Sequence, residues 1–186
     1  KEQGIQAGQL NQHFIFNALN MIKSAAIMED KKMVCRMVDD FSCYLRYTIN
    51  AEKGAEIVPF EKEMKVAKSY ANIEMARFPS IHVTYQLEEH LFGLPVMTLQ
   101  PLLEQAINFG LAKRMQGGEV TIRSRREETH CVVEIENSGR GYTLEEMTQE
   151  AVNRYDQIVE RIEKQAGGSL ELFQKDTSEG SVIRIS

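Results

Sequence analysis

Residues 13–20 read His-Phe-Ile-Phe-Asn-Ala-Leu-Asn, a stretch that sets one ionisable ring and two carboxamides among large apolar side chains. At about 100° per residue, the polar positions around this stretch fall within roughly one quarter of a helix circumference. They are Gln6, Gln9, His13, Asn17, Asn20 and Ser24. A buried, unpaired polar group costs about 1–3 kcal/mol, so the stripe is predicted to face solvent or a docking partner while its apolar flanks, including Phe16 and Leu19, pack. His13 is then a presented imidazole; the alternative from spacing alone is a half-buried packing residue.

The composition is that of an ordinary globular chain. It has 186 residues, of which 42% are hydrophobic. This is enough for one domain, or for a small helical unit joined to a compact α/β domain. The net charge is −5, and no Lys/Arg cluster is interleaved with aromatic residues. Nucleic acid is therefore not an expected partner.

Cysteine usage and hydropathy indicate the cytosolic side of a cell. Cys35, Cys43 and Cys131 are odd in number and lack metal-ligand spacing, which is typical of free thiols in a reducing compartment. No apolar run approaches 18 residues, and no signal-peptide pattern opens the chain. Because the first residue is Lys1, we expect a piece of a longer protein, in which any membrane segment would lie upstream.

The N-terminal part of the chain is predicted to be a helical hairpin. Residues 5–28 form one predicted helix, and apolar residues spaced by three and four predict a second helix over about 31–50. The Glu29-Asp30 break between them indicates antiparallel packing. Two helices with apolar flanks on more than one side cannot bury everything against each other, so we expect a homodimer with a four-helix bundle. Residues 1–53 are assigned to this dimerisation unit.

Residues 54–186 mix helices with strands. Gly54 and Pro59 mark a linker before this second unit. Helices are predicted over about 60–78, 98–114 and 143–166, and strands over about 81–85, 119–126, 129–136, 169–174 and 181–185. This order of helices and antiparallel strands favours an α+β fold, with a two-layer α/β sandwich following the hairpin.

A polar face is predicted on the helix of residues 98–114. Gln100, Glu104 and Asn108 lie one turn apart on one face, with Gln105 beside them. Carboxylate and amide oxygens suit a hydrated Mg²⁺ and a nucleotide, because Mg²⁺ keeps waters and needs only one or two protein oxygens. The alternative is a solvated helix face that binds nothing.

A short glycine-bearing loop follows the predicted strand of residues 129–136. It reads Asn137-Ser138-Gly139-Arg140-Gly141 and precedes a helical pattern. Glycines at 139 and 141 allow the backbone to approach a flat ring or a phosphate closely. The alternative is a plain turn.

Several blocks of the chain, taken in order, resemble the LytS-type sensor histidine kinases. The blocks are HFIFNALNMI (13–22), LRYTI (45–49), PFEKEMKVAKSYANIEMARF (59–78), LQPLLEQAINFGL (99–111) and GSLELFQKDTSEGSVIRIS (168–186). The resemblance covers nearly the whole chain. It implies a dimeric helical unit that bears a phosphoacceptor histidine, followed by an ATP-binding domain, residues 54–186, of the Bergerat type shared with gyrase and chaperones.

The resemblance also implies the roles of particular residues. His13 would attack the terminal phosphate of ATP as a neutral imidazole, and Asn17 would orient the ring or the incoming phosphate. Glu104 would hold a water of the Mg²⁺ shell or accept the imidazole proton. Gln105 stands at the metal-binding amide position. The other implied nucleotide-binding residues are Asn108, Asn137, Gly139 and Gly141. The phosphoryl group would then pass to an aspartate in the receiver domain of a response regulator.

The chain departs from the family pattern at the nucleotide-binding positions. Gln105 replaces an asparagine, Phe109 replaces a histidine, and Gln12 replaces a common proline. Asn137 replaces the adenine-reading aspartate, and it retains a hydrogen-bonding oxygen but no charge. The 25 residues of 142–166, where the family has a mobile lid and a second glycine box, contain no glycine.

Two other functions stay open beside the kinase. A non-catalytic relative, a pseudokinase or scaffold, would keep the fold and the dimer but bind nucleotide poorly. An ATP-driven conformational clamp would hydrolyse ATP without forming phosphohistidine.

Overall fold

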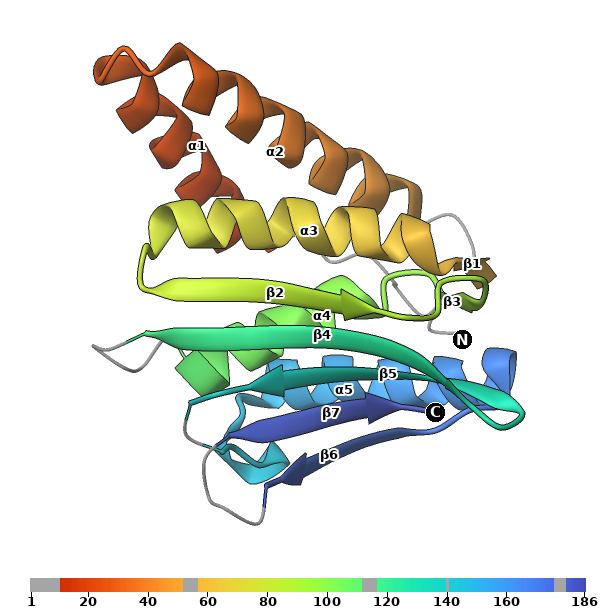
Figure 1. Ribbon diagram of the computed structural model, residues 1–186. Helices are drawn as coiled ribbons and strands as arrows, with labels where there is room; N and C mark the ends of the chain where they lie inside the picture. Colours follow the sequence, from red (N-terminus) through yellow and green to blue (C-terminus); the bar gives the residue numbers. More distant parts are fainter. Residues whose placement is uncertain (1–10, 52–56, 112–116, 140, 176–179) are drawn as a thin grey trace, which may run out of the picture.

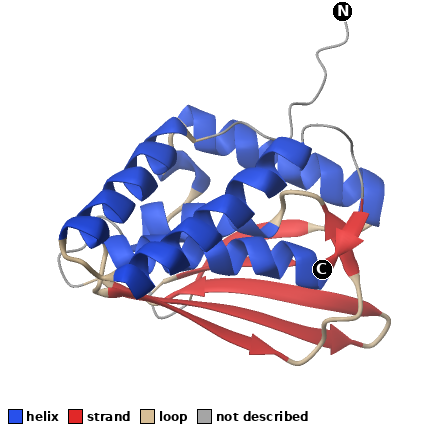
Figure 2. Cartoon of the chain, turned by 90° about the horizontal axis from the view of Figure 1, so that it is seen from above, coloured by secondary structure: helices blue, strands red, loops and turns tan. Residues whose placement is uncertain are grey.

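Helices lie over one face of a five-stranded sheet, and a helical hairpin packs on top of them (Figure 1; Figure 2). The computed structural model describes residues 11–51, 57–111, 117–139, 141–175 and 180–186. The arrangement confirms the predicted α+β fold with its two-layer sandwich. No helix within these ranges is both long and apolar enough to cross a membrane.

The first helix, α1 (Gln12–Ile27), begins where Asn11 caps it. The Asn11 Oδ1 accepts a hydrogen bond from the Phe14 N–H at 3.1 Å, which satisfies one of the free donors at the helix start. Asn11 itself is extended, so the prediction of a helix that runs through this position from residue 5 is wrong. The predicted segment 5–10, with Gln6 and Gln9, lies outside the described residues.

The second helix, α2 (Lys31–Ala51), returns antiparallel to α1 as predicted (Figure 1). Glu29 adopts a left-handed φ of 57° in the turn between them. The Asp30 Oδ1 then accepts a hydrogen bond from the Met33 N–H at 2.9 Å, which fixes the start of α2. Both helices rest on α3 (Phe60–Arg77), which follows its predicted bounds.

Aromatic rings join the hairpin to α3. The Phe14 ring centroid lies 4.6 Å from that of Tyr44 on α2 and 4.8 Å from that of Tyr70 on α3. Burial raises the pKa of Tyr44 to about 12. On the other side of α1, Phe16 is 65% exposed and Leu19 is 48% exposed. The prediction that both flanks pack is therefore wrong within one chain, because α2 and α3 cover only one side of α1.

The sheet has the strand order β2-β4-β5-β7-β6. Its strands are β2 (Ile81–Leu87), β4 (Gly118–Glu127), β5 (His130–Asn137), β6 (Leu170–Gln174) and β7 (Ser181–Ile185). Neighbours are antiparallel except β2 and β4, which are parallel, so the sheet is mixed. A separate antiparallel pair joins β1 (Ile57–Pro59) to β3 (Gly93–Pro95). The sequence did not predict this pair, because strands of three residues show no period.

Two predicted helices are interrupted. The helix α4 (Leu99–Gln105) continues over Ala106–Leu111 as wider π-helical turns. In place of one helix over 143–166 the chain forms a 3₁₀ turn (Leu144–Glu146), α5 (Gln149–Arg161) and a π-helical turn (Ile162–Ala166). The prediction of a continuous helix fails at Thr148, which is extended and caps α5 by accepting a hydrogen bond from the Ala151 N–H at 3.3 Å.

A buried carboxylate on α3 holds the start of α4. The Glu63 oxygens accept hydrogen bonds from the N–H groups of Met97, Thr98 and Leu99 at 2.7, 2.8 and 2.8 Å. The Tyr47 hydroxyl on α2 donates to the same carboxylate. Glu63 is only 1% exposed, and burial raises its pKa. One side chain thus connects α2, α3 and α4 inside the core.

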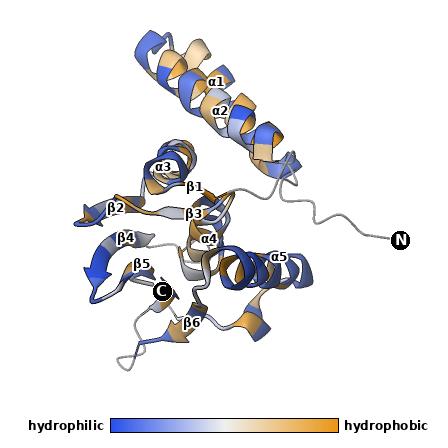
Figure 3. Ribbon diagram, turned by 90° about the vertical axis from the view of Figure 1, so that its right-hand side faces the viewer, coloured by the Kyte–Doolittle hydropathy of each residue, from blue (hydrophilic) through white to orange (hydrophobic). Residues whose placement is uncertain are grey.

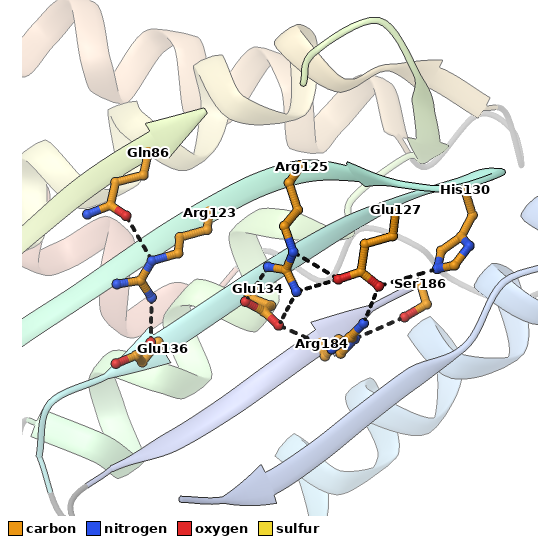
Figure 4. A network of polar contacts seen from close by, with 9 residues as sticks. All are labelled: Gln86, Arg123, Arg125, Glu127, His130, Glu134, Glu136, Arg184 and Ser186. Carbon is orange, nitrogen blue, oxygen red and sulfur yellow. Dashed lines mark hydrogen bonds and ion pairs between the residues drawn. The ribbon is translucent and has the colours of Figure 1, made fainter. Parts of the chain in front are cut away.

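The outer face of the sheet carries an ion-pair network instead of a second helical layer (Figure 4). Arg125 donates to Glu134 through two nitrogens, at 2.7 and 3.1 Å, and Arg123 pairs with Glu136. Arg184 on β7 joins Glu127 at 2.7 Å. Part of β4 is correspondingly hydrophilic (Figure 3). Because these charged side chains are paired with one another and reach solvent, the outer face of the sheet does not require a second layer of helices.

Replacing Glu63 with alanine should lower the free energy of unfolding by about 3 kcal/mol or more, because three N–H groups and a hydroxyl lose their acceptor inside the core. Urea denaturation measures the change. The matched control is Glu61→Ala, two residues away on the exposed side of α3, which should stay within about 0.5 kcal/mol of the parent. Equal losses for the two variants would contradict the assigned role of Glu63.

Protonation of Glu134 should weaken the sheet in acid. The hydrogen bonds from Arg125 hold the pKa of Glu134 below its usual range, so its stabilising contribution is present above the unfolded pKa of about 4.3 and is lost as pH falls through the lower folded pKa. The variant Glu134→Gln should be less stable by about 1 kcal/mol at neutral pH and should match the parent in strong acid. Denaturation across pH tests this, with exposed Glu171→Gln on β6 as the control; a constant difference at every pH would contradict it.

Candidate functional site

His13 lies in the first turn of α1 with its ring exposed, as the sequence predicts. Its Nδ1 is 3.1 Å from the Asn17 Nδ2, one helical turn further on. With the amide in this orientation, Asn17 donates to Nδ1 and the ring proton lies on Nε2. Rotating the amide by 180° places its oxygen against an Nδ1 proton and frees the lone pair of Nε2. In either arrangement Asn17 fixes the orientation of the imidazole.

Asn11, two residues before His13, ties the start of α1 to α4. While its oxygen caps α1, its Nδ2 donates a hydrogen bond to the Glu104 Oε1 at 2.7 Å. These two residues are 93 positions apart in the sequence. The structure therefore brings the predicted acceptor helix and the predicted nucleotide-binding helix together. Sequence reasoning missed Asn11, although an asparagine just before an apolar-periodic segment is a typical N-cap signal.

Glu104 is 7% exposed, and its carboxylate is contacted by the side chains of Asn11, Gln100 and Arg154. The Gln100 Nε2 donates to its Oε2 at 3.1 Å, which confirms that these residues share a face of α4. The Arg154 guanidinium on α5 lies 3.4 Å from the same oxygen and pairs with Glu150 at 3.1 Å. Arg154 also lines a cavity of about 150 Å³ between α4 and α5. Sequence reasoning missed it, because nothing in the segment 142–166 indicated which residue would face α4.

Gln105 lies under α5. Its side chain is 4% exposed, and its Nε2 donates to the Ala151 carbonyl at 3.1 Å. Its Oε1 is buried and has no hydrogen-bond partner among the described residues. Asn108, by contrast, is exposed. Asn108 lies in the π-helical turns that begin at Ala106, beyond the buried residues of α4.

The loop after β5 packs directly on the end of this helix. Asn137 is fully buried at the end of β5, and its Oδ1 accepts a hydrogen bond from the Ser181 N–H at 3.0 Å. A Cβ at Gly139 would meet the Gly110 carbonyl oxygen at 2.2 Å, and a Cβ at Gly110 would meet the Asn137 side chain at 2.6 Å. Gly141 likewise lies against Gly180, where a Cβ would be 3.0 Å from the carbonyl oxygen. Close backbone packing therefore requires a glycine at position 139 and leaves little room for a side chain at position 141.

The chemistry of these groups fits Mg²⁺ and a nucleotide. The Gln105 Oε1 is a buried oxygen that still needs a partner, and a hydrated Mg²⁺ requires only one or two protein oxygens. The Asn137 side chain carries an amide oxygen, the kind of acceptor that an exocyclic amine requires. No set of three or more His, Cys, Asp or Glu side chains within the described ranges could hold a metal. The other end of the same amide, Nε2, is held by the Ala151 carbonyl in the first turn of α5.

Comparison with known proteins shows similarity to histidine kinases. The family model described as histidine kinase matches residues 3–81. The sensor histidine kinase BtsS of Escherichia coli K12 is 36% identical over 137 residues, which cover 72% of this chain and 24% of that protein. The sensor protein LytS of Staphylococcus saprophyticus is 28% identical over 142 residues, covering 75% and 24%. The chain thus spans about a quarter of the length of the curated relatives that it matches.

Solved structures agree on the fold. The histidine kinase domain of the blue-light activated histidine kinase EL346 from Erythrobacter litoralis has a TM-score of 0.55 at 17% identity, with 93% of both chains covered. The catalytic domain of histidine kinase ThkA has a TM-score of 0.54 at 16% identity, covering 71% of this chain and 94% of that one. Fold and sequence together define the class, a histidine kinase core. Within that class, the chain belongs to the LytS-type sensor histidine kinases.

Replacing Asn11 with alanine should remove both the cap and the tie to Glu104, and should lower the free energy of unfolding by about 1–2 kcal/mol. The variant Asn11→Ser retains a capping hydroxyl, but its side chain is one bond shorter and should not reach Glu104. Amide hydrogen exchange at Phe14 reports the cap. It should be faster in Asn11→Ala and close to the parent in Asn11→Ser; unchanged protection in both variants would contradict the capping role.

Proposed function

We propose that this chain is the kinase core of a sensor histidine kinase that phosphorylates His13 with ATP and passes the phosphoryl group to an aspartate of a response regulator. The observation that carries the proposal is the position of His13, exposed in the first turn of a helix whose cap contacts Glu104. Family membership supplies the expected chemistry. No other described part of the chain presents an imidazole beside the helix that bears Gln105.

His13 is the nucleophile in this proposal. Phosphoryl transfer depends on positioning and charge neutralisation more than on covalent help. Asn17 supplies positioning, because its amide lies 3.1 Å from Nδ1 of the ring; with the amide oxygen turned toward an Nδ1 proton, the lone pair of Nε2 is free to attack. Asn17 is a positioning residue rather than a proton carrier, since an amide does not titrate.

The charged residues of the proposed site are Glu104 on α4 and Arg154 on α5. Glu104 is the proposed acceptor of the proton that the imidazole loses. Three neighbours hold its carboxylate in place, from α1, α4 and α5. Arg154 is 24% exposed and contacts Glu104 from the solvent side, where a guanidinium can bind a phosphate through two nitrogens.

When bound, ATP supplies the phosphoryl group and Mg²⁺ neutralises part of its charge. We assign Gln105 to the metal, on the basis of its buried oxygen, and Asn137 to the adenine amine, on the basis of the family resemblance and of an amide oxygen that can accept a hydrogen bond. Gly139 keeps the loop after β5 close to the π-helical turns that follow α4, and Gly141 lies against Gly180. We assign these glycines and the exposed Asn108 to the surroundings of the nucleotide.

The proposed assembly is a homodimer through the hairpin. Phe16, Leu19 and Ile27 on α1 are 65%, 48% and 73% exposed, and Val38 and Ile49 on α2 are 42% and 47% exposed. An exposed apolar surface of this size on two helices marks an association site. The receiver domain of a response regulator would bind the same hairpin, where it can reach His13. We place the core on the cytoplasmic side of a membrane-bound protein whose sensor region precedes it.

Labelling with γ-labelled ATP and Mg²⁺ tests the function. The parent protein should acquire acid-labile label, and His13→Ala should acquire none. The matched control is His82→Ala, an exposed histidine on β2, which should be labelled like the parent. Label that survives in His13→Ala would contradict the proposal. Free phosphate without protein label would instead indicate a conformational clamp, and absence of ATP binding in calorimetry would indicate a scaffold.

A further inference from the structure

We infer that His13 receives its phosphoryl group from nucleotide bound to its own chain. The inference rests on the proposed kinase function and adds the direction of transfer. The hydrogen bond between Asn11 and Glu104 joins the start of the acceptor helix to the nucleotide helix within a single chain. The alternative is transfer between the two chains of a dimer, from nucleotide on one chain to His13 of the other.

Two contacts hold the start of α1 on its own α/β domain. The first is the 2.7 Å hydrogen bond from Asn11 to Glu104, the residue next to Gln105. The second is the packing of Phe14 between Tyr44 and Tyr70, at centroid distances of 4.6 and 4.8 Å. His13 lies between these two anchored residues in the sequence. Its backbone is therefore fixed relative to the α4 of the same chain.

Dimerisation leaves these contacts intact. At about 100° per residue, Phe16 lies about 200° around α1 from Phe14. Phe14 is 2% exposed and faces α3, whereas Phe16 is 65% exposed. A second copy seated on Phe16 and Leu19 therefore approaches α1 from the side away from α3. The Asn11–Glu104 contact need not break for the dimer to form.

The chemical step balances within one chain. A bond forms between the Nε2 of His13 and the terminal phosphorus, while the bond from that phosphorus to the bridging oxygen breaks and ADP leaves with the electron pair. The proton left on Nδ1 passes to a base, for which Glu104 is the proposed group. The products are ADP and phosphohistidine on the chain that bound the nucleotide.

The dependence of the labelling rate on protein concentration tests the direction. A double variant, Phe16→Asp with Leu19→Asp, replaces exposed apolar residues with charges and should be monomeric by sedimentation. Transfer within one chain predicts a labelling rate per chain that is the same at every protein concentration. Transfer between chains predicts a rate per chain that rises in proportion to concentration, and that result would overturn the inference.

The remaining outcomes are also decisive. A monomeric variant that is folded and binds nucleotide but is not labelled, beside a parent that is labelled as a dimer, would overturn the inference. If the double variant fails to fold, the parent diluted until it sediments as a monomer gives the same test. A parent that is never labelled contradicts the proposed function itself, which separates the two failures.

Asn11 has a positioning role in this inference. The variant Asn11→Ser keeps the cap and loses the tie, so the maximal labelling rate should fall about 10-fold while the apparent KM for ATP stays the same. The matched control is Asn20→Ser, an exposed carboxamide on the same helix, which should leave both quantities unchanged. A parallel rise in KM, or an unchanged maximal rate, would show that Asn11 does not position His13.

Discussion

The buried carboxylate of Glu63 is the constraint on which the rest of the structure depends. Three successive N–H groups, from Met97 to Leu99, converge on it, and the Tyr47 hydroxyl completes its hydrogen bonding. Met97 adopts a left-handed φ of 59° at this point, a conformation that costs a non-glycine residue free energy. The turn forms an anion-binding concavity, and hydrogen bonds to a charged group, each worth about 1.5–3 kcal/mol, offset the strain.

This clamp fixes where α4 begins, and therefore where its functional side chains lie. Glu104 and Gln105 follow one to two turns after the clamped residues, in a helix whose residues are all buried. On the far side of the same turn, the Arg161 guanidinium donates to the carbonyls of Val96 and Met97. The clamp thus couples the hairpin, α4 and the end of α5 through one short segment of backbone. A displacement of any of these elements must be accommodated at Glu63.

Periodicity predicted what depends on neighbours in the sequence. The hairpin, α3 and the strands follow from their apolar spacing, and the exposure of His13 follows from the cost of burying a polar stripe. Contacts between distant segments left no such signal. Asn11 with Glu104 and Arg154 with Glu104 join residues 93 and 50 positions apart. The change from α to π turns after Gln105 was also not predicted, because it leaves no periodic mark in six residues.

The two ends of α5 are held in the fold with unequal strength. Its last turn is anchored by Arg161, which is 6% exposed and bound to two carbonyls in the core. Its first turn is held by a neutral hydrogen bond from Gln105 to Ala151 and by the partly exposed pair of Arg154 with Glu104. Such contacts contribute about 1 kcal/mol each. The weakly held end is therefore the one that lies over Gln105, while the end anchored by Arg161 keeps α5 in the fold.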